Sequence, residues 1–460
     1  MRSGGTRPRT PGEIGLSASY ARGAAVLSVG IGLTGLITFG YFSLASHSLD
    51  PDEYGRISLL WSSVFITVSV LYRPVEQMLA RTIADHDERG VPGTHHLRVA
   101  ATIQLALGVL FVGAALALRG PLQDELFGGS ATLYWIMVVA VLAYAASYFA
   151  RGFLAGHHRF GLYGGLVLME ASSRCLFALA VAVGIAEGEN AVALGMAAAP
   201  IVSLAVVPWA LGRRLRRRPD RLPGDPADPE TDAAGDPEFT LSRGTSFAAA
   251  VLLIMLCEQT FLNAGPLLVE ATEGAAGAAL AGFTFNVLLI ARAPLQLFQA
   301  VQASILPHLT RLRAGGEADP FRRSVNLTLA AIAGFAAAVA VVLLAAGPLL
   351  MELLFGDEFD YDRGGLVIVA AGMGLYLAGA TLNQALLAHG RAPRAASVWA
   401  LAAAGFVLFL VAADFDDRVL QVQLAFTGAA ACLCGGLYAL YRSTVSSAHV
   451  ERTAARRSRA

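Results

Sequence analysis

Long apolar segments separated by short polar turns repeat along the whole chain. A membrane-spanning helix needs about 20 apolar residues, because each residue advances only about 1.5 Å through a hydrocarbon layer about 30 Å thick. Twelve segments reach this length, at 22–46, 54–80, 97–118, 131–151, 162–186, 190–212, 245–269, 276–306, 325–347, 365–388, 395–413 and 419–441. The pattern predicts an all-α polytopic membrane protein with twelve transmembrane helices.

A polar linker divides these segments into two sets of six. It covers 213–243, opens with a run of arginines and contains three Asp-Pro pairs. Because chain of this composition cannot bury enough apolar surface to fold, we expect a disordered linker. It would join an N-terminal six-helix lobe, 22–212, to a C-terminal six-helix lobe, 244–441. The N-terminal tail 1–21 and the basic tail 442–460 are predicted to be cytoplasmic.

The second segment, 54–80, becomes charged before its apolar character ends. Arg73 and Gln77 share one helical face with two serines, and Glu76 lies beside Arg73. Pro74 cannot donate to the carbonyl four residues earlier, which predicts a kink. A charge inside a bilayer costs several kcal/mol. This face therefore either lines a protein interior or lets Arg73 extend to the lipid head groups.

The eighth segment, 276–306, carries a long polar stripe. A proline two residues after its arginine supplies a kink. Amides on such a stripe can hydrogen-bond to other helices, but its length and its charge favour the wall of a cavity. The stripe consists of one arginine and three glutamines at i, i+4, i+7 and i+10: Arg292, Gln296, Gln299 and Gln302.

Three further charges lie within apolar segments. Glu170 precedes Arg174 by four residues, the favourable order for an ion pair on a helix. The two residues form either a structural pair or part of a site. Glu258 has no neighbour in sequence that would neutralise it, so it either takes up protons or pairs with Arg292.

The two sets of six segments show a weak internal repeat. Arg73-Pro74 in the second segment corresponds to Arg292-Ala-Pro294 in the eighth. The fourth segment ends in FLAGHHR at 153–159, and the tenth ends in LLAHGR at 386–391. Both pairs occur at matching positions and with the same orientation. This predicts a parallel repeat about an axis along the membrane normal, with a substrate site between the halves.

Composition agrees with a membrane protein and excludes several functions. The chain is 55% hydrophobic and 15% charged, whereas soluble proteins contain about 25% charged residues. Its net charge of zero excludes a generally basic surface for nucleic acid. The four cysteines match neither a disulfide framework nor a zinc site. Without a Walker-type loop or a nucleophile–base arrangement, we expect no enzyme, cofactor or metal.

The distribution of arginine predicts the orientation. All 34 basic residues are arginine, and with a cytoplasmic N-terminus 27 of them fall on inside segments and four on outside loops. Loops rich in positive charge stay in the cytoplasm. We therefore expect both termini there. The absence of lysine from a chain rich in alanine and glycine suggests a bacterial protein, located in the inner or plasma membrane.

Several short stretches, in order along nearly the whole chain, resemble one family of transporters. They resemble the polysaccharide flippases of the multidrug/oligosaccharidyl-lipid/polysaccharide exporter superfamily, above all bacterial lipopolysaccharide or O-antigen export proteins. The stretches are 49–55 (LDPDEYG), 73–77 (RPVEQ), 156–159 (GHHR), 292–307 (beginning RAP), 354–359 (LFGDEF) and 386–391 (LLAHGR).

The resemblance implies two six-helix bundles in a V that open alternately to either side of the membrane. The substrate would be a polyprenyl-pyrophosphate-linked glycan, flipped to the outer leaflet for polysaccharide biosynthesis. Membrane lipids, a polysaccharide polymerase and glycosyltransferases would be its partners. The residues that would bind pyrophosphate or sugar are Arg73, Gln77, Arg292, Gln296 and Gln299. Those that would form ion pairs or couple transport to protons are Glu76, Glu170, Arg174 and Glu258.

Other classes of protein stay open. A proton-coupled small-molecule or drug exporter, of the same superfamily or of the major-facilitator type, also has twelve helices. The basic motif of major-facilitator proteins is missing, because the corresponding loop, 85–90, reads DHDERG. A drug/cation antiporter would be expected to have acidic rather than arginine-rich cavity walls. A non-transporting scaffold of a polysaccharide-synthesis complex would tolerate loss of the arginines.

Overall fold

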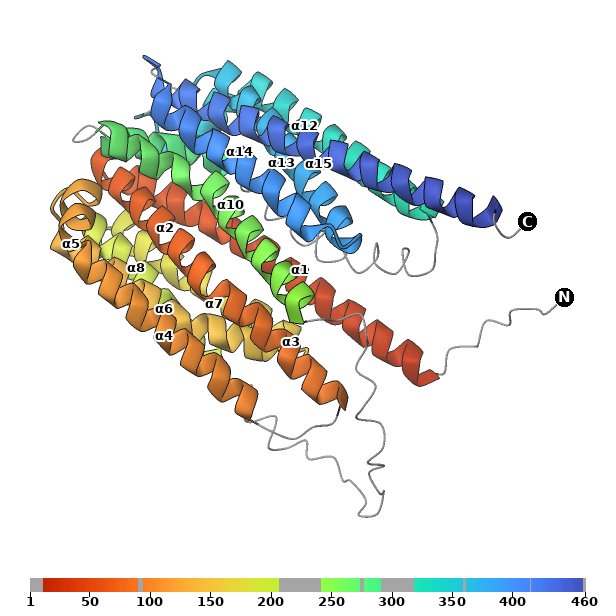
Figure 1. Cartoon of the computed structure of the whole chain (residues 1–460). Helices are drawn as coiled ribbons and strands as arrows, with labels where there is room; N and C mark the ends of the chain where they lie inside the picture. Colours follow the sequence, from red (N-terminus) through yellow and green to blue (C-terminus); the bar gives the residue numbers. More distant parts are fainter. Residues whose placement is uncertain are drawn as a thin grey trace.

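The computed structural model describes residues 11–89, 94–206, 241–273, 277–290, 318–358, 361–413 and 415–457, and their regular structure is helical throughout (Figure 1). The N-terminal half contains α1 (Pro11–Ser48), α2 (Pro51–Leu71), α3 (Arg73–Arg89), α4 (His95–Ala117), α5 (Arg119–Pro121), η1 (Leu122–Leu126), α6 (Ala131–Gly156), α7 (Phe160–Ala182), α8 (Gly188–Ser203) and η2 (Leu204–Val206). The C-terminal half contains α10 (Leu241–Glu273), the helix Gly277–Ile290, α12 (Ala318–Phe355), α13 (Arg363–Ala388), α14 (Ala392–Ala412) and α15 (Arg418–Arg457). The all-helical architecture predicted from the sequence is confirmed for this part of the chain.

Ten of the described helices are long and apolar enough to cross a membrane, so the chain is a multi-pass membrane protein. They match ten of the twelve predicted spans. The predicted span 190–212 is described as α8 and η2, which together end at Val206. The predicted span 276–306 is described only as the apolar helix Gly277–Ile290. Because the remainder of both lies outside the described residues, the number twelve stays a prediction.

The first and last helices are longer than the sequence pattern indicated. α1 begins at Pro11, inside the segment predicted as a tail, and α15 continues to Arg457. The predicted linker 213–243 lies outside the described residues except for its last three positions, which begin α10. Its predicted disorder and the domain boundaries beside it therefore stay predictions.

The helix is interrupted near Pro74, and the kink predicted there stays a prediction. The single predicted helix 54–80 is divided at Tyr72 into α2 and α3. The backbone N–H of Tyr72 donates to Val68 O at 2.9 Å, and the N–H of Glu76 donates to Tyr72 O at 3.0 Å. Pro74 has no N–H to continue this ladder, so the helix breaks just before its charged residues.

Helices pair in the same way in the two halves. In the N-terminal half, α1 packs on α7, α7 on α8, and α6 on α8. In the C-terminal half, α10 packs on α14, α14 on α15, and α13 on α15. Each set repeats the pairs first–fifth, fifth–sixth and fourth–sixth. The parallel repeat expected from the sequence is therefore present in the packing, and we call the halves the N-terminal and C-terminal lobes.

The two lobes touch at the end of the molecule where α1 finishes and α2 begins. Here α2 packs on α10, and α1 meets α12. Gly55 permits a close approach, since a Cβ at this position would lie 1.8 Å from Ala278 O. Tyr54 Oη donates a hydrogen bond to Asn286 Oδ1 of the other lobe. We call this contact the seam; its members are Phe42, Tyr54, Gly55, Ala278, Phe285 and Asn286.

Candidate functional site

Polar and charged side chains from three helices converge inside the N-terminal lobe. On α6 and on α7 they are spaced by three, four or seven residues, which places them on one face of each helix. α3 packs on α6, and α6 packs on α7, so the three faces meet. We call the group the polar cluster; its members are Arg73 and Glu76 from α3, Tyr144, Ser147 and Arg151 from α6, and Tyr163, Glu170 and Arg174 from α7.

Glu170 is the most completely bonded member of the cluster, although it is only 2% exposed. Its Oε2 forms a salt bridge with Arg151 Nη2, and its Oε1 accepts from Ser147 Oγ. Ser203 Oγ, at the end of α8, lies 3.4 Å from the same Oε1. These donors provide the pairing that a buried carboxylate requires. Its ion-pair partner is thus Arg151 on the neighbouring helix and not Arg174 on its own helix.

Arg174 is held mainly by aromatic groups. The side chain is 4% exposed, and its Nη1 donates to Tyr144 Oη. Its Cζ lies 5.0 Å from the centroid of the Trp61 ring and 5.5 Å from that of Phe65, distances typical of cation–π contacts. Within the described residues no carboxylate forms a salt bridge with it. Its described partners are thus a phenol and two aromatic rings.

Two glycines bring α3 against α6. A Cβ at Gly152 would lie 2.8 Å from Glu76 O, and one at Gly156 would lie 2.6 Å from Ile83 Cβ. Small residues four apart allow such close packing of membrane helices. The approach carries Glu76 to α7, where its Oε1 accepts a hydrogen bond of 2.8 Å from Tyr163 Oη. Glu76 was expected to form an ion pair or to couple transport to protons, and its described hydrogen-bond partner is a tyrosine of another helix.

Arg73 connects the cluster with the other lobe. Its half-buried guanidinium interacts electrostatically with Glu258 of α10 and with Glu76 of its own helix. Arg73 therefore lies within electrostatic reach of the C-terminal lobe. Glu258 was expected either to take up protons or to pair with Arg292. In the structure, the charge of Glu258 acts on Arg73 of the N-terminal lobe.

The remaining predicted site residues are not among the described members of the cluster. Gln77 is exposed. Arg292, Gln296 and Gln299 lie outside the described residues, so the predicted arrangement of two arginines around one phosphate stays a prediction. Four members of the cluster, Tyr144, Ser147, Arg151 and Tyr163, were missed by the sequence analysis. Arg151 is one of the 27 arginines assigned to inside segments, although it continues the face of α6 four residues after Ser147.

Buried amides lie in the interior of the C-terminal lobe. Gln259, Asn263 and Asn383 are each less than 9% exposed, and Asn263 Nδ2 donates to Gln259 Oε1 at 3.1 Å. Asn383 Oδ1 and Gln384 Oε1 are buried and accept no hydrogen bond from the residues that the structure describes. These oxygens can accept hydrogen bonds from a ligand or from water.

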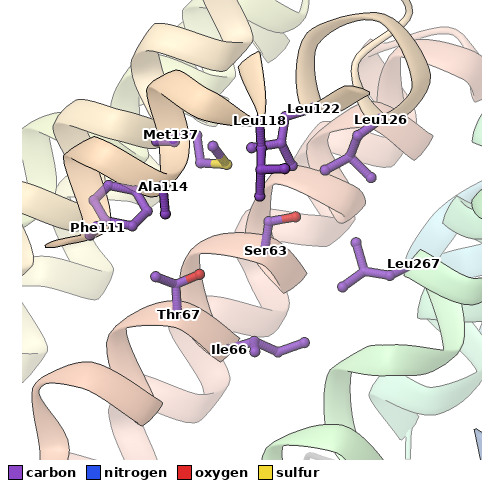
Figure 2. Close-up of a pocket in the computed structure, with 11 residues that line it drawn as sticks. Ser63, Ile66, Thr67, Phe111, Ala114, Leu118, Leu122, Leu126, Met137 and Leu267 are labelled. Carbon is purple, nitrogen blue, oxygen red and sulfur yellow. The ribbon is translucent and has the colours of Figure 1, made fainter. Parts of the chain in front are cut away.

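A separate cavity of about 330 Å³ lies between the lobes, beside the seam (Figure 2). Leu267 of α10 borders it on one side, and residues of α2, α4, η1 and α6 border it on the others. Two hydroxyl side chains, Ser63 and Thr67, lie among apolar neighbours. Ser63 Oγ already donates to Leu59 O, so the lining is largely hydrocarbon. No member of the polar cluster takes part in it.

The cluster has the chemistry of a binding or coupling site. It holds three arginines against two glutamates, an excess of one positive charge. Arginine stays charged at any physiological pH and binds planar anions through two parallel hydrogen bonds. Within the described residues no group of three histidine, cysteine or acidic side chains is arranged to hold a metal ion.

Comparisons with known proteins establish the fold. No family model and no curated protein matches the sequence. A multidrug resistance MATE family transporter of the MOP superfamily, in an inward-facing conformation, superposes with a TM-score of 0.61 at 13% identity, over 92% of this chain and 98% of that one. A mutant of the MATE transporter VcmN from Vibrio cholerae gives 0.55 at 16% identity, over 94% and 98%.

A third structure differs in its pocket. It is a MOP superfamily transporter from Pyrococcus furiosus, described as having a binding pocket of reverse polarity that suggests a different function. Its TM-score is 0.60 at 12% identity, over 93% of this chain and 96% of that one. The chain thus has the fold of the MATE transporters. The likeness does not extend to a particular substrate.

Proposed function

We propose that the chain is a membrane exporter that works by alternating access and carries small amphiphilic molecules. The seam is the observation that supports this best. Two lobes with the same helix pairing meet at one end. The hydrogen bonds and ring contacts described between the lobes lie in the seam and beside it, where Phe39 and Ser46 of α1 meet Phe355 of α12. Solved transporters of this fold include both inward-facing and outward-facing conformations.

The predicted orientation decides on which side of the membrane the seam lies. With the N-terminus in the cytoplasm, as the arginine distribution predicts, the seam seals the outer side of the membrane. The structure then corresponds to a state that admits substrate from the cytoplasm. Release would require Tyr54 to part from Asn286 and the apposed backbones at Gly55 and Ala278 to separate.

The charge of the polar cluster favours anionic or neutral substrates over cations. Its excess of positive charge would repel an organic cation. Arg174, with only aromatic and phenolic partners, is the member best able to attract an anionic group. The described reverse polarity in the Pyrococcus furiosus protein supports the idea that this fold accommodates pockets of either charge.

The second candidate function is the flippase suggested by the sequence resemblance. It would move a polyprenyl-pyrophosphate-linked glycan to the outer leaflet, beside a polymerase and glycosyltransferases. Arg73 supports this reading, since it lies within reach of the other lobe and guanidinium groups bind phosphate bidentately. The flippase hypothesis also requires Arg292 to face Arg73 across the space between the lobes.

Cross-linking of the seam tests alternating access. Cysteines would replace Tyr54 and Asn286 in a chain whose four native cysteines are changed to alanine. A short bifunctional methanethiosulfonate reagent should stop transport in proteoliposomes, and a reductant should restore it. A matched pair of cysteines within one lobe, at Tyr134 and Ala115, should react without effect, because Tyr134 Oη and Ala115 O are bonded inside the N-terminal lobe. Undiminished transport after cross-linking of the seam would contradict the mechanism.

Two substrate assays separate the candidates. Proteoliposomes would be loaded with anionic, neutral or cationic fluorescent amphiphiles, or would contain a fluorescent polyprenyl-pyrophosphate disaccharide in one leaflet. An amphiphile exporter should move the first set and not the second, and a flippase should do the reverse. A non-transporting scaffold would move neither the amphiphiles nor the disaccharide lipid, whether or not the seam is cross-linked.

A further inference from the structure

Glu270 of α10 is a buried carboxyl that the polar cluster does not include. It is 7% exposed and lies close to the seam, because a Cβ on Gly277, next to Ala278, would be 2.6 Å from its Oε2. That oxygen has no hydrogen-bond donor among the residues that the structure describes. An ionised carboxylate buried without a donor pays a desolvation cost of several kcal/mol, and the neutral acid avoids most of it.

The cation that acts on Glu270 among the described residues already forms a salt bridge with another acid. Arg56 of α2 and Asp52 of the same helix are the charged groups that act on Glu270. The Nε of Arg56 forms a salt bridge of 2.7 Å with Glu189 Oε2 of α8. A second acid from α2, Glu53, acts electrostatically on Glu189. A single arginine therefore serves several carboxyls.

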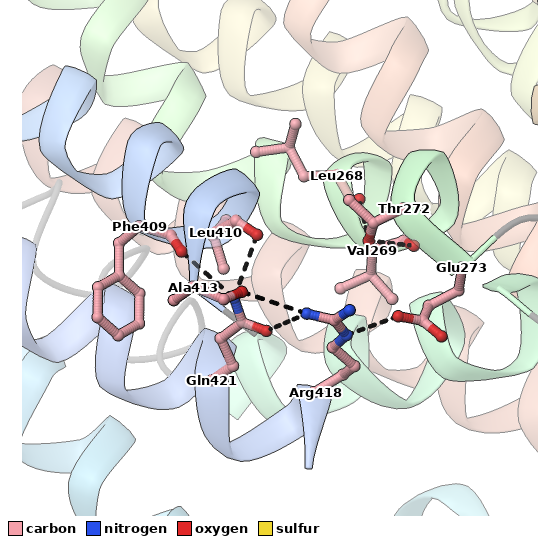
Figure 3. Close-up of polar contacts among 9 residues, drawn as sticks. All are labelled: Leu268, Val269, Thr272, Glu273, Phe409, Leu410, Ala413, Arg418 and Gln421. Atoms are coloured by element: carbon pink, nitrogen blue, oxygen red, sulfur yellow. Dashed lines mark hydrogen bonds and ion pairs between the residues drawn. The ribbon is translucent and has the colours of Figure 1, made fainter. Parts of the chain in front are cut away.

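The other charges near the end of α10 are paired with one another. Glu273, three residues after Glu270, forms a 2.6 Å salt bridge with Arg418 of α15. Arg418 also donates to Gln421 Oε1 at 2.8 Å, and both contacts are visible in Figure 3. The described helix that follows, Gly277–Ile290, contains no charged residue. Neither element offers Glu270 a cation.

We propose that Glu270 is a proton-operated latch: its neutral carboxyl permits the seam to close, and its ionised form favours the open seam. The proposal rests on the alternating-access function above. On closing, the carboxylate takes a proton from water and forms an O–H bond before it is buried. On opening, water reaches the carboxyl, the O–H bond breaks, and the proton returns to the solvent on the side of the seam.

The direction of the pH dependence follows from linkage. Because the closed seam holds the neutral acid and the open seam holds the carboxylate, closing binds a proton. Acid conditions therefore stabilise the closed seam, and a rise in pH shifts the population toward the open one. For one proton, the ratio of open to closed molecules changes by at most about tenfold per pH unit.

Distance measurements between spin labels test the latch. Cysteines at Asp124 and Asp357, both exposed at the seam end of the two lobes, would carry the labels in the otherwise cysteine-free protein. Double electron–electron resonance in nanodiscs should show a longer distance that grows in population between about pH 5 and about pH 9. Glu270→Gln, which mimics the neutral acid, should keep the short distance throughout.

The control is the neighbouring acid on the same helix. Glu273→Gln loses only a partly exposed pair and should retain the pH response of the wild type. An identical response in Glu270→Gln and wild type would overturn the latch, and so would a shift caused by sodium at constant pH. The distances report the seam without any substrate. A protein that changes distance with pH but transports nothing would refute the proposed exporter and leave the latch intact.

Discussion

The fourth and fifth helices of the N-terminal lobe, α6 and α7, correspond in position to α13 and α14 of the C-terminal lobe. The two pairs differ in their buried side chains. α6 and α13 each contain 26 residues and begin 232 positions apart, and α7 and α14 begin at the same separation. At this offset Tyr144 corresponds to Tyr376. The charged positions of the N-terminal lobe correspond to uncharged ones: Arg151 to Asn383, Glu170 to Ala402, and Arg174 to Phe406.

The difference shows that the charges are not needed to build this arrangement of helices. In the C-terminal lobe, Phe406 stacks on Phe261 with ring centroids 5.5 Å apart, and Tyr376 and Trp399 pack beside them. Buried ion pairs seldom stabilise more than apolar groups of similar volume. The buried charges of the N-terminal lobe therefore carry a desolvation cost. Such charges are typical of residues used for binding or coupling in a membrane protein.

The largest expected effect comes from moving charge into the C-terminal lobe. Phe406 is fully buried, so Phe406→Arg would place a guanidinium against the Phe261 ring. We expect a loss of several kcal/mol in the free energy of unfolding and little folded protein, measured by thermal unfolding in detergent. Phe406→Leu, the control, should cost roughly 1–2 kcal/mol. Normal yield of Phe406→Arg would mean that the two interiors are interchangeable.

The second effect tests the ion pair of the N-terminal lobe. Glu170→Ala removes the partner of Arg151 and leaves that guanidinium buried and unpaired, at an expected cost of about 3–5 kcal/mol. Replacing both residues, Glu170→Leu with Arg151→Met, should recover most of the stability, since no charge stays unpaired. The partly exposed pair of Glu273 and Arg418 provides the control, and Glu273→Ala should cost at most about 1 kcal/mol. Equal losses for the two glutamates would show that burial does not distinguish these pairs.

Helix positions and faces could be read from the sequence, because they depend on local spacing. The apolar segments, the break before Pro74 and the repeated histidine-bearing helix ends all follow from residues close together in the chain. The partner of Glu170 did not follow. Local spacing favoured Arg174, but Arg151 lies on another helix, and only the rotation of α6 against its neighbours decides which arginine reaches the carboxylate.

The seam could not be predicted from the sequence for a related reason. Tyr54 and Asn286 are 232 residues apart and belong to different lobes. Gly55 looks like an ordinary small residue until Ala278 is placed against it. Glu270 was not noticed either, because its apolar surroundings come from the packing of other helices and not from its sequence neighbours.

A smaller effect on stability, but a clear one on transport, is expected from Arg174→Phe. This change gives the N-terminal lobe the residue that its counterpart has, among the rings of Trp61 and Phe65. Stability should change by less than about 1.5 kcal/mol, as for other substitutions that preserve volume. Export of an anionic amphiphile should fall by about tenfold or more, the loss of one charged hydrogen bond. Unchanged export would show that the cluster is structural.

The smallest effect concerns a polar feature that both lobes retain. His157 and His389 are the C-cap residues of α6 and α13, and their backbone angles agree within about 11°. The Nδ1 of His157 lies 2.9 Å from Phe153 O, and that of His389 lies 2.8 Å from Ala385 O. A carbonyl only accepts, so Nδ1 carries the proton in both.

Alanine at either histidine should therefore cost about 0.5–1.5 kcal/mol, measured by thermal unfolding of the purified variants. The two losses will differ in one respect. The ring of His157 contacts Phe153 of its own helix, whereas that of His389 contacts Phe321 of α12, with centroids 4.7 Å apart. His389→Ala removes a contact between helices as well as a cap, so its loss should be the larger. A larger loss for His157→Ala than for His389→Ala would mean that these helix ends do not stabilise the helix packing that the two lobes share.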